Sequence, residues 1–182
     1  MADILIKLAD KIENMELRNK VKEILKSPEL SNPDMKNYKS VPIHTSPAGY
    51  AGFEHHMVEG GLVLHTKNVV ELSLQIADFI EKNYYPVNKD YVIAGALLHD
   101  IMRIFDFKKD KKGNYEIVNK LLEHSELIGC ELYARGFPEE VIHIVLSHLG
   151  NKPIATLEAM IVNFADTIDS HVDVYVRGVL KS

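Results

Sequence analysis

The sequence contains a single cysteine, no tryptophan and no long apolar run. The lone thiol, Cys130, can form neither a disulfide nor a thiolate metal site within the chain. No apolar stretch approaches the roughly 18 residues that a membrane span needs, and charges interrupt the N-terminal segment too often for a signal peptide. These absences predict a soluble protein of the reducing cytoplasm, with no membrane partner.

The sequence also has fewer basic than acidic residues. It contains 21 Lys and Arg against 26 Asp and Glu, which gives a formal net charge of −5. Proteins that bind nucleic acid rely on a basic surface to displace counterions, so this balance disfavours a nucleic-acid partner. The one basic cluster, KKDKKG at residues 108–113, is typical of a solvated turn. A small anionic substrate remains compatible with the charge, and a homo-oligomer is left open.

The 182 residues are enough for one domain, residues 1–182, whose core needs no metal or disulfide to be stable. A bound metal would therefore serve function. Apolar residues at helical spacing predict helices over 4–25, 61–82, 87–102, 121–135, 138–149 and 154–180. Alternating residues on both sides of KKDKKGN predict a β-hairpin, and residues 32–61 form a long irregular segment. The pattern is that of an all-α protein with a small β-hairpin insertion.

Histidines interrupt the apolar faces of four predicted helices. They are His65, His99, His124 and His148. An inward histidine on its own is most often a core residue with one hydrogen bond. Four of them are harder to explain separately, because an unpaired buried polar group costs roughly 1 to 3 kcal/mol. A shared cation would satisfy all four, and Asp100 and Asp166 fall where they could join it.

The ligand chemistry limits the metal. Imidazoles and carboxylates without thiolates suit iron(II), manganese, cobalt, nickel or zinc, and suit magnesium only weakly. Two more histidines, His55 and His56, precede the helix that Gly60 and Gly61 open, where free backbone N–H groups favour phosphate. In the same irregular segment, Tyr50 and Phe53 could stack on a flat heterocycle or pack the segment onto the core.

The order His65, His99-Asp100, Asp166 resembles the H…HD…D signature of the HD-domain metal-dependent phosphohydrolases. The resemblance covers nearly the whole chain and implies an HD-domain helical bundle in which these four residues hold a metal ion. His124 and His148 match the added ligands of members with two ions, which Asp100 would bridge. The resemblance favours iron(II), with manganese(II) next.

Within the family, HHMVEGGLVLHT and SHLG…EAMIVNFADTID are similar to two groups. One comprises archaeal phosphodiesterases of pterin biosynthesis, which act on dihydroneopterin 2′,3′-cyclic phosphate. The other is the HD part of bacterial 3′-to-5′ exoribonucleases, which also carry a nucleic-acid-binding domain for which this chain has no room. The small cyclic phosphate is therefore the favoured substrate. An exoribonuclease or a nucleotide phosphohydrolase with the same site, and a sensor that binds a nucleotide without turnover, remain as alternatives.

The resemblance also implies a mechanism, in which a hydroxide bridging the two metals attacks phosphorus. Arg103 stands where many members have lysine, in HDIMR instead of HDIGK. A guanidinium can bind phosphate through two donors but does not readily give up a proton. Proton donation to the leaving oxygen is therefore assigned to His55 or His56, and phosphate binding to Arg103.

Overall fold

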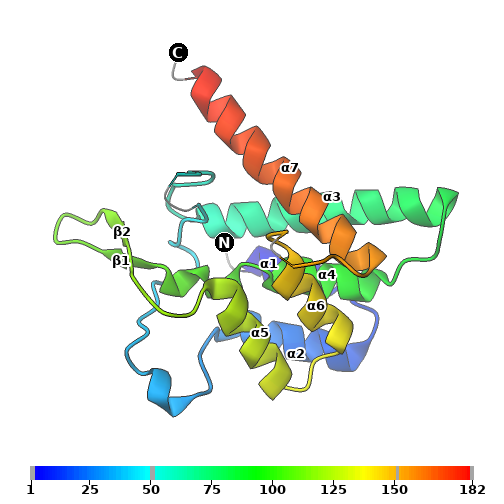
Figure 1. Ribbon diagram of the computed structural model, residues 1–182, viewed down its shortest axis with the longest axis horizontal. Coiled ribbons are helices and arrows are strands. Elements are labelled where there is room, and N and C mark those ends of the chain that lie inside the picture. Colours follow the sequence, from blue (N-terminus) through cyan, green and yellow to red (C-terminus); the bar gives the residue numbers. More distant parts are fainter. Residues whose placement is uncertain (1–2, 50–51, 151, 181–182) are drawn as a thin grey trace.

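In the computed structural model the described residues, 3–49, 52–150 and 152–180, form an all-α bundle with one β-hairpin (Figure 1). Side chains are described up to residue 178. The all-α prediction with a hairpin insertion is confirmed. The helices are α1 (Asp3–Ala9), α2 (Met15–Lys26), α3 (Gly61–Asn83), α4 (Lys89–Leu98), α5 (His124–Ala134), α6 (Glu139–Ser147) and α7 (Leu157–Leu180), with 3-10 turns η1 (Pro33–Met35) and η2 (Ile101–Phe105).

Helix α4 is the centre of the bundle because it is apolar on every side. Its residues 92–98 are all buried, and it packs against α2, α3, α6 and α7. Gly95 lets α6 come close, since a Cβ at this position would lie 2.4 Å from the Cγ2 atom of Ile144. Helices α3 and α6 therefore meet around α4, whereas α5, which carries His124, packs against α6 and η2.

The N-terminal segment differs from the prediction of one continuous helix. It forms two helices, because the chain turns after α1 and Asn14 then caps α2 by accepting a hydrogen bond from the Leu17 amide. The carboxylate of Asp90 accepts hydrogen bonds from the backbone of Glu13 and Asn14. Asp90, from a distant part of the chain, thus fixes the turn between the two helices. Helical periodicity alone does not reveal such a contact.

The predicted hairpin is confirmed as β1 (Phe107–Lys109) and β2 (Tyr115–Ile117), which pair antiparallel with Phe107 opposite Ile117. The Asp110 carboxylate accepts hydrogen bonds from the backbone of Lys112 and Asn114 and so closes the turn. The hairpin projects from the body next to α5 (Figure 1).

The last helix, α7, packs across α3, and its C-terminal half extends beyond the rest of the bundle (Figure 1). One side of α7 carries Asp166, Asp169 and Asp173, which all contact histidines of other segments. Among the described residues, no helix combines the length and the apolar composition that crossing a membrane would require.

Candidate metal centre

The adjacent pair His99-Asp100 marks the point where the central helix ends. His99 keeps helical angles (φ −53°, ψ −42°), whereas Asp100 leaves them (φ −112°, ψ 4°) before η2 begins. On a continuous helix, neighbouring side chains point about 100° apart. The break removes that restriction, so both side chains enter the same buried region. The predicted helix over 87–102 is therefore too long.

A first group of side chains surrounds the Nε2 atom of His65. Nε2 of His99 lies 3.2 Å from it, Asp166 Oδ1 3.1 Å and Asp100 Oδ2 3.6 Å. These side chains come from α3, the end of α4 and α7. His65, His99 and Asp100 offer ligand atoms close enough together to hold a divalent cation. The carboxylate of Asp166 approaches the same Nε2 atom of His65.

A second group uses the other oxygen of Asp100. Its Oδ1 atom lies 3.0 Å from Nε2 of His124 and 3.3 Å from Nε2 of His148. All three atoms are buried, and none has a hydrogen-bond partner within the described part of the chain. Buried polar atoms without partners are costly, so this convergence fits a bound cation. Asp100 lies between the two groups, with one oxygen facing each.

Each of the four histidines is oriented through its other ring nitrogen. Nδ1 of His99 bonds to the Ala96 carbonyl and Nδ1 of His148 to the Val145 carbonyl. Nδ1 of His65 lies 2.7 Å from Asp169, and Nδ1 of His124 lies 3.4 Å from Asp106. Acceptors at Nδ1 keep a proton there and leave Nε2 free to bind a metal. The sequence interpretation did not identify Asp106 or assign Asp169 this role.

Burial and neighbouring charges change the pKa values of the clustered groups. Burial by itself lowers the pKa of His65. Hydrogen bonds to the carboxylates of Asp166 and Asp169 have the larger combined effect and raise this pKa to about 10. Burial lowers the pKa of His99 to about 4. Burial also disfavours the charge of Asp166, yet the imidazole of His65 lowers its pKa to about 2. The carboxylates therefore remain ionised, as metal ligands must be, and a cation that binds Nε2 of His65 would have to displace a proton from it.

The Asp169→Ala variant is expected to bind divalent metal about 10- to 100-fold more weakly, because His65 loses the acceptor that fixes its orientation. Titration against a competing chelator measures the affinity, and kcat/KM is expected to fall by a similar factor. Asp78→Ala, which removes a carboxylate from a surface ion pair, serves as the control. Unchanged metal affinity in Asp169→Ala would exclude the positioning role.

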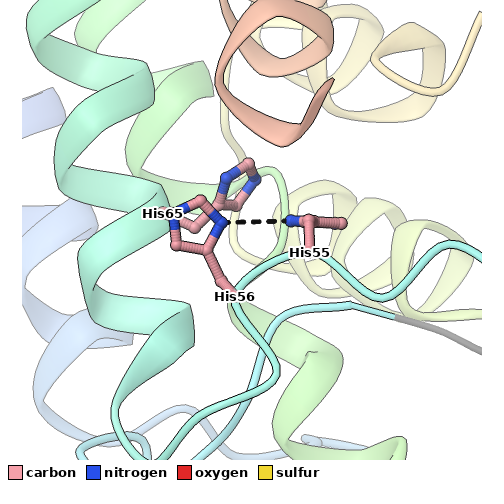
Figure 2. Close-up of side chains that lie close together, drawn as sticks. All are labelled: His55, His56 and His65. Carbon is pink, nitrogen blue, oxygen red and sulfur yellow. Dashed lines mark hydrogen bonds between the residues drawn. The ribbon is translucent and has the colours of Figure 1, made fainter. Parts of the chain in front are cut away.

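His55 and His56 lie beside the first group, both buried, on the turn that precedes α3. Figure 2 shows their rings close to that of His65, with the Nδ1 atoms of His55 and His56 3.4 Å apart. His56 has a φ of 46°, which is unusual for a residue with a side chain. Its backbone amide donates to Asp173 at 2.6 Å. The carboxylate of Asp173, on the last helix, therefore holds this turn in place.

The turn also depends on Gly61, where an added Cβ would lie 1.9 Å from the His56 carbonyl oxygen. Gly61→Ala is expected to destabilise the fold by about 2 kcal/mol, as overpacking typically does, and to displace both histidines. The melting temperature would fall by roughly 4 to 8 °C. Gly178→Ala, on α7 with open space around it, is the control and should leave melting unchanged or slightly higher.

The other residues singled out in the sequence lie in different surroundings. Arg103 is buried, and its Nε donates to Asp100 Oδ2 at 2.7 Å. Phe53 packs its ring against His171 of α7, with centroids 4.9 Å apart, and Tyr50 lies outside the described residues. Cys130 is exposed.

A comparison with protein families matches the HD domain over residues 62–170. The chain is 43% identical to the dihydroneopterin 2′,3′-cyclic phosphate phosphodiesterase of Methanocaldococcus jannaschii, with 95% of this chain and 71% of the relative covered. No solved structure matches significantly.

More distant similarity links the chain to bacterial 3′-5′ exoribonucleases. It is 28% identical to YhaM of a Geobacillus species over 70% of this chain, and 25% identical to YhaM of Bacillus subtilis over 82%. The chain spans only 42% and 52% of the length of these two relatives.

Proposed function

The chain belongs to the HD domain family of metal-dependent phosphohydrolases, and on this premise we propose that it hydrolyses dihydroneopterin 2′,3′-cyclic phosphate. The similarity to the M. jannaschii phosphodiesterase supports the substrate. The observation that carries the chemistry is the position of Asp100, whose two oxygens face two separate pairs of histidines.

In this proposal, the chain holds two divalent cations. His65, His99 and Asp166 would hold one of them with Asp100, and His124 and His148 would hold the other with the same carboxylate. Iron(II) is the favoured metal and manganese(II) the next, in keeping with a donor set of imidazoles and carboxylates. Cations held there would lower the pKa of a coordinated water and offset charge that develops on the phosphate.

Hydrolysis adds water to phosphorus, breaks one ring P–O bond and leaves a phosphate monoester with a free hydroxyl group. Arg103 would orient the phosphate, because its guanidinium is buried beside Asp100 and offers several donors in one plane. His55 and His56 would act at the leaving oxygen, which must receive a proton. Burial lowers the pKa of His55 to about 4, so its neutral ring would donate a hydrogen bond to this oxygen, and the proton released by the attacking water would be passed to the same oxygen.

The direct test is to purify the protein without chelator, measure its metal by elemental analysis and supply iron(II) or manganese(II). Dihydroneopterin 2′,3′-cyclic phosphate, adenosine 2′,3′-cyclic phosphate and short RNA oligomers then compete in a single assay. We expect the pterin ester to be consumed first, with one phosphate monoester as product. Preferred consumption of RNA would support an exoribonuclease instead. Ligand-dependent melting shifts without product would support a sensor.

A further inference from the structure

A cavity of about 570 Å³ opens from the second group of the metal centre. Its inner end is formed by Arg103, Asp106 and His124, of which His124 faces Asp100. Its walls come from the hairpin, the connection from β2 to α5 (Figure 1), and the residues that follow α6. The volume is typical of sites that bind small organic molecules.

The walls away from the metal centre are largely apolar. They consist of Gly49, Phe107, Ile117, Val118, Leu122 and Leu149. Ile117 is 51% exposed and Leu149 37%, so both present apolar surface to solvent. Phe107 and Ile117 are paired across the hairpin. The register of the two strands therefore brings both residues to this wall of the cavity. Apolar surface lining a concave site favours an uncharged ligand group with apolar faces.

The charges around the cavity leave little attraction for a second phosphate. The two cations of the lining, Arg103 and Lys120, both contact Asp106, and Arg103 also contacts Asp100. Glu123 adds another negative charge at the wall. A polynucleotide would bring further phosphates that need their own cations. The cavity therefore fits a compound with a single phosphate at the metal end.

Asn119 adds an uncharged polar group to the lining of the cavity. Its side chain is exposed, lines the cavity and has no hydrogen-bond partner among the residues described by the structure. An amide offers both a donor and an acceptor. The amide oxygen can accept a hydrogen bond from the ring N–H of a lactam-containing heterocycle, and the amide NH₂ group can donate one to the adjacent C=O.

We propose that this cavity binds the uncharged planar heterocycle of the substrate, with its polar edge at Asn119 and the phosphate at the Arg103 and His124 end. The proposal rests on the phosphodiesterase function proposed above and assigns the hairpin insertion a role in specificity. Cyclic phosphates that carry a heterocycle would then be preferred over those that do not.

The test compares two substrates of the manganese-loaded enzyme, dihydroneopterin 2′,3′-cyclic phosphate and glycerol 1,2-cyclic phosphate, which has no ring to fill the cavity. Ile117→Asp and Asn119→Ala are expected to lower the ratio of the two kcat/KM values at least about tenfold. The control, Leu121→Asp, makes the corresponding aliphatic-to-aspartate change in the connection that follows β2, at a side chain that is 96% exposed and does not line the cavity. It should leave the ratio unchanged.

Binding gives a readout that does not depend on turnover. Neopterin fluoresces, so its titration into each variant measures its affinity for the cavity directly. We expect Ile117→Asp and Asn119→Ala to weaken neopterin binding at least about tenfold, and Leu121→Asp to have no effect. If the wild-type protein hydrolyses neither ester, the proposed function fails, and the titration still tests the cavity. Equal losses on both substrates or unchanged neopterin affinity would overturn the cavity assignment.

Discussion

Asp100→Asn is expected to lower kcat/KM by at least about 1000-fold. The variant keeps the size of the side chain but replaces a carboxylate, which can face two cations with two anionic oxygens, by a neutral amide. Both groups of the metal centre depend on this side chain. A loss of several kcal/mol of transition-state stabilisation corresponds to a factor of this size. Steady-state kinetics measures kcat/KM, and elemental analysis measures the metal that the variant retains.

The matched control is Asp34→Asn, which makes the same chemical change at an exposed position. It should retain full activity and full metal content. Asp100→Ala provides a further comparison, although it also leaves buried Arg103 without its 2.7 Å partner and is expected to be less stable. An Asp100→Asn protein that is folded and retains both its metal and its activity would refute the two-sided role of Asp100.

Removal of metal by chelation is expected to reduce turnover at least about 100-fold while the helical fold remains. The apolar core surrounds α4 and is built without metal ligands, and Arg103 offsets the charge of Asp100. A metal present at 100 times its dissociation constant adds about 2.7 kcal/mol of stability. The melting temperature should therefore drop by roughly 5 to 11 °C. Far-ultraviolet circular dichroism and thermal melting measure fold and stability on the same sample.

Return of iron(II) or manganese(II) should restore activity and melting temperature together. Magnesium serves as the control cation, since imidazole-rich sites bind it weakly. Full turnover in protein that elemental analysis finds free of metal would contradict the proposed chemistry. Loss of the helical signal on chelation would instead show that the cations are part of the fold.

Helical periodicity was sufficient to place several of the site residues. His65 and His148 are buried as their apolar neighbours predict, and the hairpin lies where its alternating residues and Gly113 indicate. The prediction succeeded because a helix face repeats every 3.6 residues and a strand face every two. It failed at the break after α1, which is held by Asp90 from a distant helix.

The turn before α3 shows where sequence patterns stop being informative. His56 adopts a positive φ, Asp173 accepts a hydrogen bond from its amide, and Gly61 leaves room for its carbonyl. Asp173 is 117 residues from His56 in the chain, and no local spacing connects the two. The same limit applies to Asp169 and Asp106, which orient histidines that lie on other elements.

The sequence by itself determined which side chains turn inward, because burial follows from the local repeat of apolar residues. It thereby predicted the all-α class and the histidines and acids that the structure brings close together. The family resemblance predicted that Asp100 would lie between two groups, and the structure places one of its oxygens at each of them. Only the tertiary structure decided that the α7 carboxylates hold His65 and His56, and that the hairpin forms the wall of a cavity. These features depend on distances between segments far apart in the chain, which helix packing sets and local patterns do not encode.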